Sequence, residues 1–189
     1  TEETREGQRL EIQELAAQIE DFRAGRLSED DFRPIRLRMG VYGQRQPGFQ
    51  MVRVKIPYGG LNPRQLHKLA ETATRFSTGY GHITTRQDIQ FHFVRLERVR
   101  ELLTELDDAG LTTREACGNT VRNVPACHLA GIVKGEVFDV TPIAAAVSRH
   151  FLRNPIAQSL PRKFKIAFDG CSAGTCAGLG FHDIGGVAA

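Results

Sequence analysis

The sequence predicts an α+β fold, because strand-like and helix-like apolar patterns alternate along the chain. Residues 50–57 and 82–94 alternate apolar and polar side chains at every second position, as strands with one buried face do. Residues 63–76 and 99–109 repeat apolar side chains at the three- and four-residue spacing of amphipathic helices. The order strand, helix, strand, helix indicates a mixed domain rather than an all-helical or all-strand one.

Two segments precede this pattern. Residues 9–26 predict a surface helix, since their apolar side chains recur at helical spacing: Leu10, Ile12, Leu15, Ile19 and Phe22. A polar segment follows through Gln46, and the segments SEDD at 28–31 and GQRQPG at 43–48 are typical of breaks between elements. We therefore expect an extended connection over 27–46.

The first predicted strand and helix have clear limits. The strand places Val52, Val54 and Ile56 on one face and Met51, Arg53 and Lys55 on the other. Asn62 is suited to cap the helix that follows, and Pro63 is suited to its first turn. The segment STGYG at 77–81 ends this helix.

The second predicted strand separates an apolar face from a polar one. We expect Ile89, Phe91 and Phe93 in the core, with Arg86, Asp88, Gln90 and His92 on the opposite face. The next helix has Val99, Leu102, Leu103 and Leu106 on its inner face and ends at Gly110. This order resembles half of a ferredoxin-like α+β unit.

The character of the chain changes near residue 112. Residues 111–132 are rich in Gly, Pro, Asn and Cys with weak periodicity, which predicts a functional loop region. Thr141 and Pro142 begin another helix, and residues 160–170 predict a strand with Lys163 and Lys165 on one face and Phe164, Ile166 and Phe168 on the other. We divide the sequence into 1–46, 47–111 and 112–189, and we expect the last part to be truncated.

Composition excludes several classes of protein. The 189 residues carry a net charge of +3 without a basic run, which is unlike a nucleic-acid-binding arm. No stretch approaches the 18 apolar residues of a membrane-spanning helix, and the charged N-terminal segment lacks the apolar core of a signal peptide. Four cysteines are too few for a disulfide scaffold, so we expect a cytoplasmic protein whose cysteines are thiols or metal ligands.

Cationic side chains recur at alternate positions of three predicted strands, and they point to an anion. These positions are Arg53 and Lys55, then Arg86 with Gln90 and His92, then Lys163 and Lys165, with Arg122 added from the loop region. Like charges converge away from water only when an anion neutralises them, and arginine grips carboxylates in bidentate fashion. The alternative is that each set is simply the solvated face of an amphipathic strand.

The cysteines form two sequence pairs, Cys117 with Cys127 and Cys171 with Cys176. Four thiolates suit an iron–sulfur cluster or a tetrahedral zinc ion. The gaps of nine and four residues match no zinc ribbon, so ordinary buried thiols remain the alternative.

Three motifs together resemble the nitrite and sulfite reductase haemoprotein family. They are GHITTRQDIQFHFV at 81–94, EACGNTVRNVPAC at 115–127 and LPRKFKIAFDG at 160–170. In this family, two pseudo-symmetry-related halves enclose a sirohaem coupled to a [4Fe–4S] cluster. The resemblance, which runs from about Tyr42 to the C-terminus, implies a ferredoxin-like half-domain followed by part of the sirohaem-binding α+β domain.

The resemblance also implies roles for single residues. Basic residues that hold the substrate oxyanion correspond to Arg53, Arg122, Lys163 and Lys165. Residues that contact the sirohaem and its carboxylates correspond to Thr84, Thr85, Arg86, Gln90 and His92. The cluster ligands of the family lie in its second half, as C-x5-C and C-x3-C, and neither spacing occurs here. We therefore expect no metal ligand in this chain, although Cys117, Cys127, Cys171 and Cys176 stay as candidates.

The implied activity is a six-electron reduction of a small oxyanion. A second lysine, Lys165, suits sulfite, whereas assimilatory reduction of nitrite to ammonia is the alternative. The implied partners are the C-terminal half of the enzyme and an electron donor, either ferredoxin or a flavoprotein, and the isolated fragment is expected to be inactive. A non-catalytic tetrapyrrole-binding or anion-binding module and a precorrin-type oxidoreductase also remain open. Single-stranded nucleic acid is disfavoured, because Phe91, Phe93 and Phe164 alternate away from the cations.

Overall fold

The computed structural model describes residues 2–172 and 176–189, and the chain forms two compact units. The N-terminal unit comprises the chain up to Lys55 together with Leu61–Ile83 and Ile89–Cys117. The C-terminal unit comprises Ile56–Gly60, Thr84–Asp88 and Gly118–Ala189. Helices and strands occur together in both units, which confirms the predicted α+β class. Among the described residues, no helix combines the length and apolar character that a bilayer span requires.

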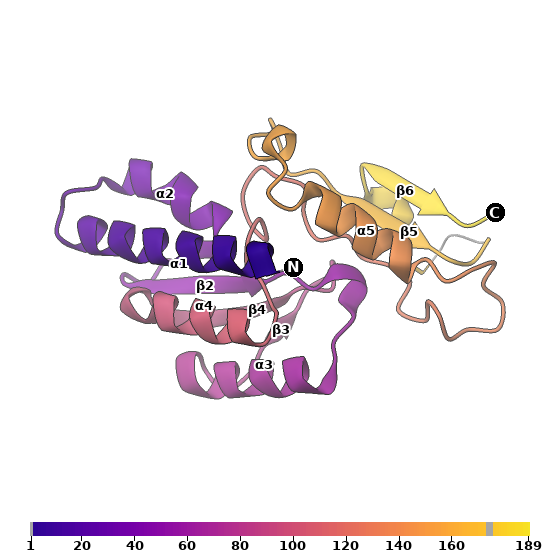
Figure 1. Cartoon of the computed structure of the whole chain (residues 1–189), viewed down its shortest axis with the longest axis horizontal. Helices are drawn as coiled ribbons and strands as arrows, with labels where there is room; N and C mark the ends of the chain where they lie inside the picture. Colours follow the sequence, from indigo (N-terminus) through magenta and orange to yellow (C-terminus); the bar gives the residue numbers. More distant parts are fainter. Residues whose placement is uncertain (1, 173–175) are drawn as a thin grey trace. The chain divides into compact units, whose positions relative to one another are not determined.

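An antiparallel sheet with the strand order β1-β2-β4-β3 organises the N-terminal unit (Figure 1). Its strands are β1 (Val41–Gly43), β2 (Phe49–Val54), β3 (His82–Ile83) and β4 (Ile89–Arg95). Its helices are α1 (Glu2–Arg23), α2 (Glu29–Arg38), α3 (Pro63–Phe76) and α4 (Val99–Asp108), with the 3₁₀ turn η2 (Leu96–Arg98) before α4. Helix α4 packs against both α1 and α3, and α3 also contacts β4.

Local signals in the sequence place α3 and α4 where they were predicted. The Asn62 side chain accepts a hydrogen bond from the Gln65 backbone N–H at 2.9 Å, and Gln65 returns one to Asn62, so the helix begins with a capping box. Gly110 lies just after α4 with a left-handed φ of 73°, which terminates that helix. The predicted inner residues of α4 are buried: Val99, Leu102, Leu103 and Leu106.

The extended connection expected over 27–46 is wrong, because α2 occupies most of it. Ser28 caps this helix, accepting a hydrogen bond from the Asp31 backbone N–H at 3.2 Å. The acidic side chains of SEDD lie in the first turn, where they interact favourably with the helix dipole. The segment that we interpreted as a break is therefore a helix start.

The single strand predicted over 82–94 is a hairpin. β3 and β4 pair antiparallel, with His82 opposite Gln90, and a turn over Thr84–Asp88 joins them. The Thr84 hydroxyl accepts hydrogen bonds from the Arg86 and Asp88 backbone N–H groups at 3.3 and 3.1 Å. Gln87 adopts a left-handed φ of 60° in this turn. Residues 84–88 are all polar, but Ile83 and Ile89 on either side of them keep an even spacing, which is why the segment suggested one strand.

Phe93 is the second correction in this segment, since it lies outside the core. Its φ is 57° and 39% of its surface is exposed, whereas the next residue, Val94, is fully buried. β2 pairs Gln50 with Val94 and Val52 with Phe91, so two residues of β4 lie opposite one residue of β2. This is a β-bulge, and it reverses the side-chain alternation.

The C-terminal unit has little regular structure. It contains α5 (Thr141–Phe151), a parallel pair β5 (Ile166–Asp169) and β6 (Ile184–Val187), and the 3₁₀ turns η1 (Pro57–Gly59), η3 (Pro155–Ala157) and η4 (Leu179–Phe181). The helix beginning at Thr141 and the irregular region after residue 111 were both predicted correctly. The strand expected over 160–170 is shorter, because only its second half pairs with β6. Small apolar side chains form the core of the C-terminal unit: Val121, Val124, Ala126, Val140, Ala144, Ala157, Ile166 and Ala188.

Candidate functional site

One face of the N-terminal sheet carries Arg53, Gln90 and His92, three of the predicted site residues, together with His82. Arg53 on β2 lies directly opposite Gln90 on β4, and Gln90 lies opposite His82 on β3, so all three side chains share one face. With the Gln90 amide oxygen oriented towards Arg53, it accepts hydrogen bonds from the guanidinium, including one from Nε at 2.9 Å. The Arg53 Nη1 group also donates to the Ala116 carbonyl at 3.1 Å. Both partners are neutral, so these contacts fix the guanidinium without compensating its charge.

His92 belongs to the same face, two residues along β4 from Gln90. Its ring stacks with that of His82 at a centroid distance of 6.0 Å. Burial, followed by the positive charges of His82 and Arg53, lowers the pKa of His92 below its ordinary value of 6.5. A neutral imidazole beside a fixed guanidinium can donate or accept a hydrogen bond, which suits contact with a polar cofactor edge.

The other predicted cofactor-binding residues lie in the Thr84–Asp88 turn of the C-terminal unit. The Thr84 hydroxyl holds the turn together, whereas Thr85 is exposed and Arg86 is partly exposed. Sequence reasoning treated Arg86 as a strand residue in line with Gln90, and the turn instead sets its direction. The hydrogen bonds of the turn therefore fix the backbone position of Arg86.

Two residues without an assigned role hold this turn. The side-chain amide of Asn123, which is fully buried, donates to the Arg86 carbonyl at 2.8 Å and to the Ile56 carbonyl at 2.6 Å. The Gln87 amide donates to the Ala126 carbonyl at 2.7 Å and accepts from the Ala126 N–H at 3.2 Å. The signal for Asn123 was an uncharged polar residue in the mostly apolar stretch 121–127, which is buried throughout.

Three of the predicted oxyanion-binding cations lie next to one backbone pairing in the C-terminal unit. Val121 pairs with Phe164 in a parallel bridge, which the Arg122 N–H reinforces by donating to the Phe164 carbonyl at 2.9 Å. Side chains alternate along extended chains, so Arg122, Lys163 and Lys165 lie opposite the face that Val121 and Phe164 turn to the core. Arg53 belongs to the N-terminal unit, and its grouping with these cations stays a prediction.

These three cations differ in their surroundings. Arg122 is 7% exposed, and Lys163 is exposed. The Lys165 ammonium donates to the Phe181 carbonyl at 3.2 Å and lies 3.4 Å from the Asp183 carboxylate. A hydrogen bond from the Lys165 backbone N–H, followed by the ammonium, lowers the pKa of Asp183. Lys165 therefore already has an anionic partner.

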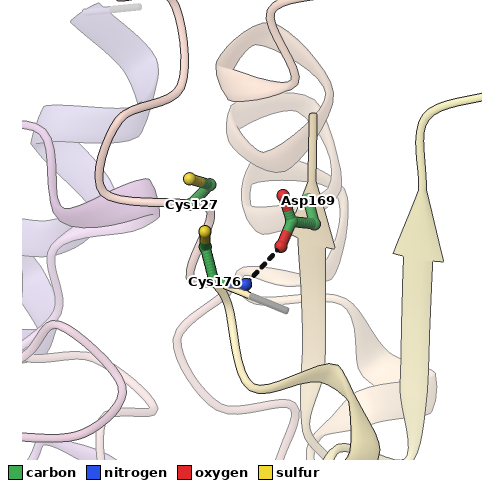
Figure 2. Close-up of side chains that lie close together, drawn as sticks. All are labelled: Cys127, Asp169 and Cys176. Carbon is green, nitrogen blue, oxygen red and sulfur yellow. Dashed lines mark hydrogen bonds between the residues drawn. The ribbon is translucent and has the colours of Figure 1, made fainter. Parts of the chain in front are cut away.

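Two cysteines from different sequence pairs lie close together in the C-terminal unit. Cys127 and Cys176 lie together with the carboxylate of Asp169, and their three ligand atoms are within 4.8 Å of one another (Figure 2). Burial is the main reason that the pKa of Cys127 and that of Cys171 are both raised, and the neighbouring Asp169 adds to it. Cys117 is buried in the N-terminal unit.

Asp169 is the least expected member of this group. Its carboxylate is fully buried and accepts hydrogen bonds from the backbone N–H groups of Cys171 at 3.1 Å, Cys176 at 2.7 Å and Ala177 at 3.2 Å. The next residue, Gly170, has no room for a side chain, since a Cβ there would lie 2.8 Å from the Phe138 carbonyl oxygen. One carboxylate thus holds the backbone of Cys171, Cys176 and Ala177.

Two family models match this chain over most of its length. Residues 42–109 match the nitrite/sulfite reductase ferredoxin-like half domain, and residues 117–189 match the nitrite and sulphite reductase 4Fe-4S domain. An assimilatory ferredoxin-dependent nitrite reductase of Haloferax mediterranei is 35% identical over 158 residues, which cover 77% of this chain and 27% of that protein. A ferredoxin sulfite reductase of Mycobacterium tuberculosis is 34% identical over 148 residues, covering 69% and 27%.

A solved structure has the same fold. The NirA protein of Mycobacterium tuberculosis superposes with a TM-score of 0.75 at 30% identity, covering 84% of this chain and 33% of that one. The chain thus spans about a quarter to a third of the length of the relatives it matches.

Proposed function

The chain belongs to the nitrite and sulfite reductase haemoprotein family, and from this premise we propose that it is the N-terminal part of a sirohaem-dependent sulfite reductase. Its role is to hold the carboxylates of the haem and to bind sulfite beside it. The ferredoxin-like half-domain at 47–111 follows an N-terminal segment at 1–46 and precedes the first part of the sirohaem-binding domain at 112–189. Sirohaem, when bound, supplies the iron that coordinates the anion and passes it six electrons.

The parallel register of Val121 with Phe164 is the observation that carries this proposal. It aligns Arg122, Lys163 and Lys165, three cations from segments about 40 residues apart, on one side of the C-terminal unit. Cations that converge in this way would be stabilised by a bound anion. Arg122 and Lys163 would hold the oxyanion, and the Lys163 ammonium would donate protons as its oxygens leave as water.

The residues that would hold sirohaem carboxylates fit an acidic tetrapyrrole. Arg53 is fixed by two neutral acceptors, so its charge remains available to a carboxylate. Arg86 projects from a turn that Asn123 and Thr84 hold in place. Gln90, His92, Thr84 and Thr85 would contribute polar contacts to the same ligand, in keeping with the neutral form of His92.

The [4Fe–4S] cluster does not fit the cysteines described in the C-terminal unit. Such a cluster needs four thiolates around a body of eight atoms. In the described part of this unit, the two thiol sulfurs and one carboxylate oxygen that come together lie within 4.8 Å of one another. We therefore propose that the cluster is ligated by the C-terminal half of the enzyme, with ferredoxin as the electron donor and the cytoplasm as the location.

Nitrite reduction is the second candidate, and the surroundings of Lys165 favour it. The ammonium lies 3.4 Å from Asp183, so part of its charge is already compensated. A site with less net positive charge suits singly charged nitrite better than doubly charged sulfite. Assays with both anions, and with Asp183→Asn, separate the two, because that variant should improve sulfite turnover relative to nitrite.

Substitutions in the full-length enzyme test the division of roles. Arg122→Ala and Lys163→Ala should each lower kcat/KM for the anion by at least about tenfold while sirohaem absorbance is retained. Arg86→Ala should instead lower the sirohaem content. Arg162→Ala is the matched control, because Arg162 is exposed and has no assigned role. Equal losses of haem and turnover in all four variants would contradict the proposal.

A further inference from the structure

The group formed by Cys127, Asp169 and Cys176 has no part in the proposed function. Its members come from three segments: the irregular chain after Ala126, the end of β5, and the chain that follows β5. Figure 2 shows the two thiols beside each other, with the Asp169 carboxylate next to them. The ligand atoms lie within 4.8 Å of one another, and Cys127 and Asp169 are buried while Cys176 is exposed.

We propose that Cys127, Asp169 and Cys176 bind a single zinc ion. Two thiolates and one carboxylate are ordinary zinc ligands, and thiolates select thiophilic metals over magnesium or calcium. With Zn–S bonds of about 2.3 Å, tetrahedral geometry places two sulfur ligands about 3.8 Å apart. The donors are already close to this separation, so binding requires side-chain adjustments of no more than about 1 Å.

Asp169 is prepared for this role by its hydrogen bonds. A carboxylate has about four lone-pair positions, and three of them accept the N–H groups of Cys171, Cys176 and Ala177. Oδ1 accepts one of these bonds and Oδ2 accepts two, which leaves a lone pair of Oδ1 for a cation. The backbone therefore orients the carboxylate in the way that outer-shell hydrogen bonds orient metal ligands.

The proposed ion would act as a structural link. It would connect the chain at Cys127 to the chain that follows β5, in a unit with few helices and strands. Cys176 is exposed, so the fourth coordination position is open to solvent and would be taken by water. The two thiols lose their protons on binding, and the ion compensates two of the three negative charges that result.

Zinc binding can be measured on the full chain, kept reduced throughout. We expect one zinc per chain by elemental analysis after dialysis, and a tetrahedral cobalt spectrum with thiolate charge-transfer absorption when Co²⁺ replaces zinc. Loss of an outer-shell partner costs about 10- to 100-fold in metal affinity, so Cys176→Ser should weaken zinc binding by more than about 100-fold. The exposed position of Cys176 makes this variant compatible with folding.

Cys171→Ser is the matched control, since Cys171 belongs to the same loop but lies outside the group of three. It should change zinc affinity by less than about threefold, well below the effect of a lost ligand. A chelator should lower the unfolding midpoint of the parent chain by about 5 °C and leave that of Cys176→Ser unchanged.

Three results would overturn the zinc site. The first is less than one zinc per chain. The second is equal zinc affinity in Cys176→Ser and the parent chain. The third is that the two thiols are occupied otherwise, by a Cys127–Cys176 disulfide or by iron with acid-labile sulfide. None of these readouts depends on reductase activity or sirohaem. The zinc site and the proposed function can therefore fail independently.

Discussion

The two units of the chain are stabilised in different ways. In the N-terminal unit, the backbone is paired in a four-stranded sheet and in helices, and its buried side chains are mostly apolar, such as Val52, Phe91 and Leu102. In the C-terminal unit, long stretches of backbone lack such pairing, and buried polar side chains bind it instead, notably Asn123 and Asp169. Irregular buried backbone must find hydrogen-bond partners somewhere, so polar residues become structural there.

The largest expected effect concerns Asp169. Asp169→Ala removes the buried acceptor of three backbone N–H groups, and we expect a loss of about 4 kcal/mol in the free energy of unfolding. Urea denaturation with a chelator present measures this loss apart from any metal. Asp139→Ala is the control, because Asp139 binds the Thr141 N–H and hydroxyl at the surface. An equally large loss of unfolding free energy in Asp139→Ala would contradict the expected difference between a buried and an exposed carboxylate.

The corresponding test in the N-terminal unit uses an apolar residue. Leu106 on α4 is 1% exposed, so Leu106→Ala should cost about 3 kcal/mol through lost burial and the cavity that remains. Leu66 on α3 is 59% exposed, and Leu66→Ala should cost less than about 0.5 kcal/mol. Thermal and urea unfolding measure both variants. Similar costs at the two positions would argue against an apolar core in this unit.

Asn123 gives a smaller effect with a functional consequence. Asn123→Ala leaves the Ile56 and Arg86 carbonyls without this donor, and we expect a loss of about 2 kcal/mol. Because Asn123 positions the turn of Arg86, sirohaem content in the full-length enzyme should also fall. Asn119→Ala is the control, since Asn119 is exposed and its bond to the Pro161 carbonyl is long, at 3.4 Å. Normal haem content in Asn123→Ala would show that the turn does not depend on this residue.

The same contrast explains how much of the structure the sequence could predict. α3 and α4 followed from periodicity with Asn62 and Gly110 as end signals, all of which act within a few residues. The hairpin over 82–94 did not, because its turn depends on the Thr84 hydroxyl and on a left-handed Gln87. Neither feature changes the even spacing of Ile83 and Ile89 on either side of the turn.

The candidate sites show a similar division. Arg122, Lys163 and Lys165 could be grouped from motif resemblance, and the register of Val121 with Phe164 supplies a physical basis for it. The association of Cys127 with Asp169 and Cys176 could not be predicted, because it depends on contacts between segments more than 40 residues apart. Sequence spacing instead paired each cysteine with its neighbour in the chain.

His92 offers the smallest expected effect, and it lies on the polar face of the sheet in the N-terminal unit. Its pKa is lowered in the folded chain, so the unfolded chain binds more protons as the pH falls below about 6.5. The part of the free energy of unfolding that depends on His92 should therefore be constant above this pH. It should decrease below this pH, until the pH passes the lowered pKa of His92 in the folded state.

His92→Asn should remove this part of the decrease, which urea denaturation at a series of pH values can measure. In an NMR titration, His82→Asn should raise the pKa of His92 towards its ordinary value, although burial would still keep it low. Identical pH profiles for the parent chain and His92→Asn would mean that His92 is as hydrated as in the unfolded chain. The polar face of the sheet would then resemble a solvated surface rather than a prepared binding face, and the proposed contact of His92 with the haem would lose its physical basis.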